Sequence, residues 1–239
     1  LSVVLAVVSD PFATPENLFN VSRNFAFIGI IALGQTLAII TGGIDLSVGS
    51  VMGLSGGGTG LVLQRGLPLE AGLAAGLATA LFFGLVNGAL VAYVRISPFV
   101  VTLGTLSIAR SLALVVSDNQ MVYEFGPDER GFLALGGGSF LGLANPVWIL
   151  LACTLLATAA LRLTAWGRHV FAIGGNESAA RLNGVAVERV KLSVYVWSSL
   201  SAGIAAVLTV GWLGAVTNAL GQTYELRVIA ASAIGGANL

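Results

Sequence analysis

A single carboxylate, Asp45, lies between two apolar stretches that are each long enough to enter a lipid bilayer. An Asp at the centre of a membrane helix costs roughly 2.5 to 3.5 kcal/mol on insertion scales, so its side chain should face a cavity, a helix end or protein. The preceding pair, Gly42 and Gly43, lets the backbone break and turn, which at membrane depth is tolerated only against protein or water. The segment from Leu33 to Ser50 therefore indicates a transport path.

Other polar side chains lie inside the apolar stretches and are candidates for the same path. Arg110 is too far from either end of its stretch to reach the interface easily, so we consider Asp45 as its internal partner. For Asn87, a hydrogen bond between helices is the alternative to substrate contact. The candidate pathway residues are Gln35, Thr36, Asp45, Asn87 and Arg110, and Thr102 and Thr105 are also polar.

The composition indicates a polytopic membrane protein. Of 239 residues, 56% are hydrophobic and 9% are charged, against about 25% charged in an average soluble domain. The 32 glycines favour closely packed helices. Zero net charge without a basic run excludes a nucleic-acid partner, and one cysteine, Cys153, excludes a disulfide framework or a metal cluster. We expect an all-α transmembrane bundle with no metal and no cofactor.

The apolar stretches predict about seven helices, with a long acidic loop over 117–145 between the fifth and the sixth. The chain opens without Met on a run too short to cross a bilayer and stops in mid-pattern, so we expect one transmembrane domain, 1–239, cut at both ends. The predicted helices are Leu1–Val8 (partial), Phe25–Thr41, Leu46–Leu63, Ala71–Val94, Phe99–Val116, Pro146–Leu161 and Leu192–Leu213, and Tyr224–Leu239 begins another.

The loop from Arg162 to Lys191 holds five of the eleven basic residues. By the positive-inside bias it should be cytoplasmic, which also places the amino terminus inside and the 117–145 loop outside an inner membrane. Within the loop, Glu177 to Leu182 is helix-compatible, with Asn176 as a cap and Gly184 as a stop. A short helix on this face is either a docking device or an ordinary connector.

Four segments in order resemble the membrane subunit of ribose-type ABC sugar importers. They are TGGIDLSVGS (41–50), SPFVVTLGTLSIAR (97–110), GRHVFAIGGNESAARLNGV (167–185) and YELRVIAASAIGGANL (224–239). The resemblance implies a ten-helix importer fold that takes a monosaccharide from a periplasmic binding protein. It also implies ATPase partners and a second permease copy. By the same resemblance, the loop enters a groove of the ATPase through Gly174, Gly175, Asn176, Glu177, Ala180, Arg181 and Gly184.

Three alternatives remain open or are disfavoured at this point. Permeases for branched-chain amino acids are related, and an ATP-independent channel or secondary transporter would also explain Asp45. A GxSxG pattern around Ser55 suggests an intramembrane serine protease, but the sole histidine, His169, lies in the basic loop and would not reach it. The phosphate-binding pattern GxxxxGK[ST] is absent from the sequence, so we expect a non-enzymatic subunit whose energy comes from a partner.

Overall fold

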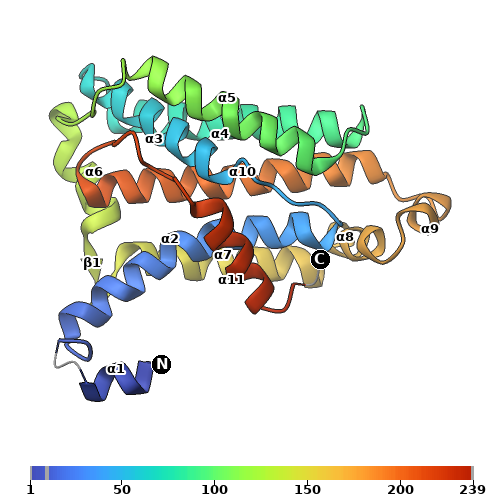
Figure 1. The fold of residues 1–239 in the computed structure, drawn as a ribbon, viewed down its shortest axis with the longest axis horizontal. Coiled ribbons are helices and arrows are strands. Elements are labelled where there is room, and N and C mark those ends of the chain that lie inside the picture. The colour runs from blue at the N-terminus through green and yellow to red at the C-terminus, as the bar shows by residue number, and fades with distance from the viewer. Residues whose placement is uncertain (1, 9–10, 238–239) are drawn as a thin grey trace.

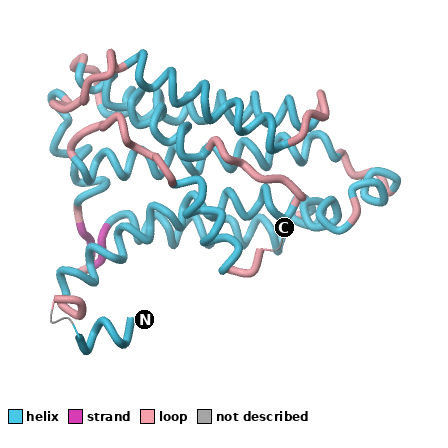
Figure 2. Tube along the Cα trace, viewed as in Figure 1, coloured by secondary structure: helices cyan, strands magenta, loops and turns pink. Residues whose placement is uncertain are grey.

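The computed structural model describes residues 2–8 and 11–237, which form a bundle of mostly parallel and antiparallel helices (Figures 1 and 2). A two-stranded antiparallel hairpin lies at one end. The elements are α1 (Ser2–Val8), α2 (Pro15–Ile40), α3 (Val48–Gln64), α4 (Leu69–Ala92), α5 (Pro98–Val116), the 3-10 helix η1 (Gly126–Asp128), α6 (Glu129–Gly137), β1 (Ser139–Phe140), β2 (Leu143–Ala144), α7 (Asn145–Leu163), α8 (Ala165–Gly175), α9 (Glu177–Leu182), α10 (Val187–Leu213) and α11 (Tyr224–Ile234).

Five helices of the described chain, α2, α4, α5, α7 and α10, are long and apolar enough to cross a membrane. The other two predicted helices are present but shorter: α3 has 17 residues and α1 has seven. The all-α membrane bundle is thus confirmed. The eighth element, expected over 224–239, is α11, and residues 238 and 239 lie outside the described residues.

Helix α10 is the centre of the bundle and packs against α2, α3, α4 and α6. In the most apolar 18-residue stretch of α10, 72% of the residues are buried, against 6% in the corresponding stretch of α7. Close approach depends on glycines of the neighbouring helices. A Cβ on Gly84 of α4 would lie 2.8 Å from the Cα of Val196, and one on Gly34 of α2 would lie 2.8 Å from the Cα of Ser198. Small residues therefore let these helices contact α10 through backbone, as lipid-embedded helices commonly do.

The long loop predicted over 117–145 is wrong in part, because it contains η1, α6 and the hairpin. Helix α6 has only nine residues, but its apolar side is fixed by tertiary contacts. The Phe132 ring is fully buried and stands edge-on to Phe125, with 4.9 Å between ring centroids. Gly136 lies so close to α10 that a Cβ would meet the Leu208 carbonyl oxygen at 1.9 Å. The contact with α10 involves residues far apart in the sequence, which is why the helical fold of this charged, Gly-rich stretch was not predicted.

Two helices also begin earlier than the apolar pattern predicted. Helix α2 starts at Pro15 rather than Phe25, because the Thr14 hydroxyl caps it by accepting from the Asn17 N–H at 3.3 Å. Helix α10 starts at Val187 rather than Leu192, so its first turns carry charged residues. Hydrophobicity marks the part of a helix that contacts lipid or core, and both helices extend beyond that part.

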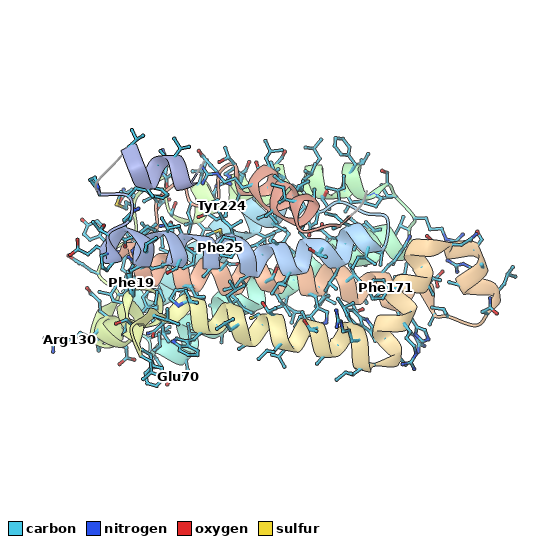
Figure 3. The ribbon with its side chains drawn as sticks, turned by 90° about the horizontal axis from the view of Figure 1, so that it is seen from below. Phe19, Phe25, Glu70, Arg130, Phe171 and Tyr224 are labelled. Atoms are coloured by element: carbon cyan, nitrogen blue, oxygen red, sulfur yellow. The ribbon has the colours of Figure 1, made fainter. Side chains whose placement is uncertain are left out.

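The bundle has two distinct ends. At one end lie α8 and α9, beyond the end of α2 and beside the turn that joins α4 to α5 (Figure 1). At the other lie α6, the hairpin and the start of α2. We call these the α9 end and the α6 end. A view from below shows the same arrangement, with α9 projecting beyond the other helices (Figure 3).

Candidate functional site

The chain breaks between α2 and α3 and runs without helix through residues 43–47. Gly42 follows the last turn of α2 with a φ of 76°, a conformation that favours glycine. Gly43 is required for space instead, because a Cβ there would lie 2.4 Å from the Tyr195 hydroxyl. The predicted break at the glycine pair is confirmed, and protein encloses it from Gly43, which is buried, whereas Gly42 is exposed.

Asp45 lies in this break and is fully buried. Its Oδ1 accepts from the Ser47 N–H at 3.0 Å and from the Ser47 hydroxyl at 2.6 Å. Its Oδ2 accepts from the Ser198 hydroxyl of α10 at 2.8 Å. The carboxylate is thus held by uncharged donors, one set local and one from the central helix.

Further hydrogen bonds connect the break to α2, α4 and α5. The Gln35 amide, with its nitrogen and oxygen placed to suit their partners, donates to the Asp45 carbonyl at 3.0 Å and accepts from its N–H at 3.2 Å. The Asn87 amide donates to the Ser47 hydroxyl at 3.0 Å and accepts from Thr105 at 2.5 Å. The break therefore contacts four helices through one polar network, and we call the six residues the Asp45 network: Gln35, Asp45, Ser47, Asn87, Thr105 and Ser198.

The structure brings together three of the five predicted pathway residues and leaves two elsewhere. Gln35, Asp45 and Asn87 belong to the network and are fully buried. Thr36 is half-buried and donates to its own helix, at the Ala32 carbonyl, over 2.7 Å.

The predicted pairing of Arg110 with Asp45 is wrong. The Arg110 guanidinium donates to the Leu220 carbonyl at 2.7 Å, in the loop before α11. It also lies beside Gly53, where a Cβ would meet it at 3.2 Å. The carboxylate that faces this region is Glu225, whose Oε2 is buried and would lie 2.5 Å from a Cβ on Gly49. Arg110 thus joins α5 to the loop before α11 through a backbone carbonyl. A backbone acceptor cannot be predicted from a sequence pattern, because every residue has one.

Ser47 and Ser198 were missed as site residues. Ser47 had a local signal, because a Ser two residues after an Asp is suited to donate back to it. Ser198 is 153 residues away from its partner and had none. Within the described chain, the buried hydroxyls of Ser50, Tyr195 and Ser199 have no hydrogen-bond partner, so uncharged polar groups continue along α3 and α10.

The second candidate site is the segment around α9, where the predicted cap and stop are confirmed. The Asn176 side chain accepts from the Ala179 N–H at 2.9 Å, and Gly184 follows the helix with a φ of 82°. Gly174 contacts the end of α2, where a Cβ would meet the Ile40 carbonyl oxygen at 2.0 Å, whereas Gly175 has open space. This segment is therefore seated on the bundle by α8 and exposed beyond it.

Charged side chains connect α9 to α10 and to the turn before α5. Arg181 pairs with Glu188 and lies 3.4 Å from Glu177, and Lys191 pairs with Glu177. Arg95 lies 3.7 Å from Glu188. The Lys191 ammonium lowers the pKa of Glu177, and Glu188 raises the pKa of the Arg181 guanidinium. One face of α9 is thus held by ion pairs, while Ala180 is buried and Leu182 is 90% exposed.

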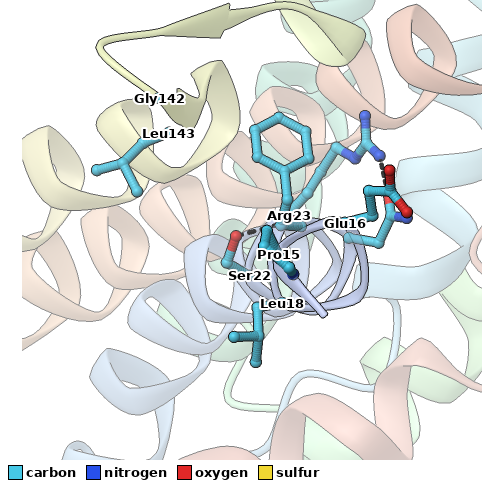
Figure 4. Close-up of a pocket in the computed structure, with 9 residues that line it drawn as sticks. Pro15, Glu16, Leu18, Ser22, Arg23, Gly142 and Leu143 are labelled. Carbon is cyan, nitrogen blue, oxygen red and sulfur yellow. Dashed lines mark hydrogen bonds between the residues drawn. The ribbon is translucent and has the colours of Figure 1, made fainter. Parts of the chain in front are cut away.

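A shallow pocket of about 630 Å³ lies at the α6 end, between the start of α2 and the hairpin turn (Figure 4). Arg23 lies in the wall of the pocket, where its guanidinium donates a hydrogen bond to the Asn20 side-chain oxygen. The guanidinium is 5.0 Å from the Trp212 ring centroid. The neighbouring Ser22 hydroxyl donates to the Phe19 carbonyl at 2.8 Å. This pocket is open to the surface and lies away from the Asp45 network.

The geometry does not provide a serine protease dyad. Ser55 lies within α3, and its buried hydroxyl has no hydrogen-bond partner in the described chain. His169 lies on α8, which packs mainly against α2, α7, α9 and α10. A nucleophile needs a base within hydrogen-bond reach.

Residues 17–239 match the family described as the permease component of a branched-chain amino acid transport system. The chain is 34% identical to the ribose import permease protein of Bacillus subtilis, over the whole chain and 74% of that protein. It is 36% identical to the L-arabinose transport system permease protein of Escherichia coli, over the whole chain and 72% of that protein. It is also 36% identical to a probable ABC transporter permease protein of Sinorhizobium fredii, again over the whole chain and 72% of that protein.

A membrane bundle with a buried polar segment between two of its helices and a projecting helical segment has the features of a transport protein, and the chain belongs to this permease family. It is a permease subunit and not an enzyme, and five apolar helices make it a multi-pass membrane protein. No solved structure matches it.

Proposed function

We propose that this permease is the membrane-spanning subunit of an ATP-driven importer that carries a monosaccharide into the cytoplasm. Although the family description names branched-chain amino acids, the ribose and L-arabinose relatives support a sugar. The observation that carries the coupling to an ATPase is α9, a capped helix at the extreme end of the molecule with Leu182 90% exposed. A channel needs no such element.

In this proposal the α9 end faces the cytoplasm and residues 162–191 engage a groove of an ATPase subunit. The coupling element comprises Gly174, Gly175, Asn176, Glu177, Ala180, Arg181 and Gly184. Movement of α9 reaches the bundle through α8, which touches the end of α2 at Ile40, and through the ion pairs to α10. Helix α2 contributes Gln35 to the Asp45 network, and α10 contributes Ser198.

Gln35, Thr36, Asp45, Asn87 and Arg110 are our candidates for the substrate pathway. Because the three network members are fully buried and hydrogen-bonded here, substrate contact would require this network to open. An ATPase can drive that change only by binding more tightly to one state of the permease than to the other.

The remaining partners follow from the same arrangement. A periplasmic sugar-binding protein would dock at the α6 end, and a second permease copy would complete the assembly. Helices α5 and α7 have outer faces that this chain leaves uncovered. Only 22% of the residues in the most apolar stretch of α5 are buried, and only 6% in that of α7. Lipid and the second copy would share these faces.

The test uses the full-length permease in proteoliposomes with its ATPase subunits and binding protein. We expect ATP-dependent uptake of labelled ribose or L-arabinose and no uptake of labelled leucine. Leucine uptake would support the branched-chain alternative, and sugar flux without the ATPase would support a channel.

A pair of variants tests the docking role of α9. Leu182→Asp should reduce retention of the ATPase subunit at least tenfold, because it places a charge at the centre of the proposed contact. Leu141→Asp is the matched control, since Leu141 is 77% exposed at the α6 end. Equal ATPase retention by both variants would contradict docking through α9.

A further inference from the structure

An apolar groove of about 610 Å³ runs between α2, α7 and α10 toward the α9 end. Its walls combine small residues such as Gly34 and Ala157 with the bulky rims Leu156 and Trp197, which are 70% and 53% exposed. Cys153 also lines it. Helices α7 and α10 bound the groove and are both long and apolar enough to span the bilayer, so the groove faces the membrane.

The hydroxyl groups in the groove and the Trp166 indole are already hydrogen-bonded within the protein. The Trp166 indole donates to the Ser193 hydroxyl at 2.8 Å, which itself donates to the Val190 carbonyl at 2.7 Å. Ser201 donates to the Ser198 carbonyl at 2.6 Å, and Thr164 donates to the Ala160 carbonyl. A sugar would find few free donors or acceptors there, whereas a hydrocarbon chain needs none.

Two arginines lie at the α9 end of this groove. Arg168 donates to the carbonyl of Thr164, a groove residue, at 3.3 Å. Arg189 is one helical turn before Ser193 on the α10 face that continues through Trp197 and Ser201. Both side chains belong to exposed residues.

These arginines differ from the other cations around α9. Arg95, Arg181 and Lys191 are all paired with Glu177 or Glu188. Within the described residues, neither Arg168 nor Arg189 has a carboxylate within 4.0 Å. Positive charge without a counter-ion is thus concentrated where the apolar groove meets the membrane surface.

We propose that this groove binds an anionic phospholipid, with an acyl chain along α7 and α10 and the phosphate between Arg168 and Arg189. Basic pockets between membrane helices at the cytoplasmic face bind anionic lipid headgroups, and arginine suits a phosphate because it donates in a planar fork. Trp166 marks the expected depth of the interface, where indoles are enriched. The bound lipid joins α2, α7 and α10 without using the substrate pathway.

The test measures tryptophan fluorescence of the full-length permease in vesicles that contain brominated phosphatidylglycerol or brominated phosphatidylcholine. Trp166 and Trp197 line the groove, so a bound brominated chain quenches them by contact. We expect phosphatidylglycerol to compete for the groove roughly ten- to thirty-fold better than phosphatidylcholine, because its headgroup has a net negative charge beside two arginines, whereas the choline ammonium cancels that charge. The double variant Arg168→Gln/Arg189→Gln should lose this preference.

Two controls keep the result interpretable. Arg162→Gln removes an exposed charge on the side of α7 that faces away from Cys153, Ala157 and Ala160, which line the groove, and it should leave the lipid preference unchanged. Ala157→Leu fills the groove and should reduce quenching by both lipids while circular dichroism remains that of the wild type. An unchanged preference in the double variant would overturn the proposal. So would the absence of quenching by either lipid together with cross-linking of two copies through Cys153, because a protein surface would then cover the groove.

Discussion

The Asp45 network and the α9 segment are both polar, but they are held together by opposite means. In the network one buried carboxylate is surrounded by hydroxyl and amide groups, without a cation within 4.0 Å among the described residues. Around α9, acids and bases that are between 18% and 42% exposed form ion pairs. Buried groups that lose a partner are destabilised by the full desolvation penalty, whereas exposed pairs exchange partners with water easily. The network therefore suits a fixed joint, and α9 suits a surface that meets other molecules.

The network should be by far the more sensitive of the two regions. Asp45→Ala removes the acceptor of three hydrogen bonds, from the Ser47 N–H, its hydroxyl and Ser198. Each unsatisfied buried donor costs about 1 to 3 kcal/mol, so we expect a loss of about 3 kcal/mol or more in the free energy of unfolding. Denaturant unfolding of the purified permease in detergent measures this.

A double-mutant cycle shows whether the loss comes from the network. Ser198→Ala alone should cost less than Asp45→Ala, and the double variant should show a coupling energy of about 0.5 to 3 kcal/mol. Strictly additive losses would mean that Asp45 and Ser198 do not act together, and the contrast with α9 would lose its basis.

The packing around the network should be the next most sensitive feature. Gly84→Ala would place a Cβ 2.8 Å from the Val196 Cα, so α4 and α10 would have to separate. Overpacking of this kind typically costs about 1 to 3 kcal/mol. Gly104→Ala is the matched control, because a Cβ at Gly104 has nothing within 4 Å. In thermal unfolding, the midpoint temperature of Gly104→Ala should equal or exceed that of the wild type. A similar loss of stability in both variants would point to a general effect of glycine replacement.

Local chemistry made α9 predictable, whereas the network depended on contacts between distant helices. Asn176 and Gly184 act within a few residues of the helix that they bound, so type and spacing were enough. Asp45 could be predicted as a site residue because it is a single charged residue in an apolar region. Its partner Ser198 is an ordinary serine in an apolar helix, selected only by how α10 packs against the break.

Arg110 illustrates the same limit from the other side. A guanidinium inside a predicted membrane helix leads one to look for a carboxylate, and Asp45 was the candidate because it lies between two apolar stretches. The acceptor is instead the Leu220 backbone carbonyl, a group that every residue carries. Helix α6 was missed for a related reason, since its contact with α10 involves backbone at Gly136 and Leu208.

The corrected position of Arg110 can be tested against the earlier pairing. Asp45→Asn and Arg110→Gln should now have additive effects on stability, within about 0.3 to 0.5 kcal/mol, because the two side chains share no partner. Unfolding of the two single variants and the double variant measures this. A coupling energy above 1 kcal/mol would restore a direct connection between them and weaken the separation of the network from the α11 region.

The α9 ion pairs should give the smallest effect. Glu177→Gln removes the partner of Lys191 and of Arg181, yet the Glu177 side chain is 42% exposed, so we expect a loss below about 1 kcal/mol that shrinks in high salt. Lys191 lowers the pKa of Glu177 in the folded state, so this contribution is present above the pKa of an unfolded Glu, near 4.3, and disappears as the pH falls through the lower folded value.

Hydrogen exchange at the amides of α9, measured between pH 3 and 6, should therefore show faster opening at the acid end in the wild type and little change in Glu177→Gln. If instead the variant loosened α9 as strongly as Asp45→Ala loosens the break, exposed ion pairs here would be as rigid as the buried hydrogen bonds, and the distinction between joint and docking surface would fail.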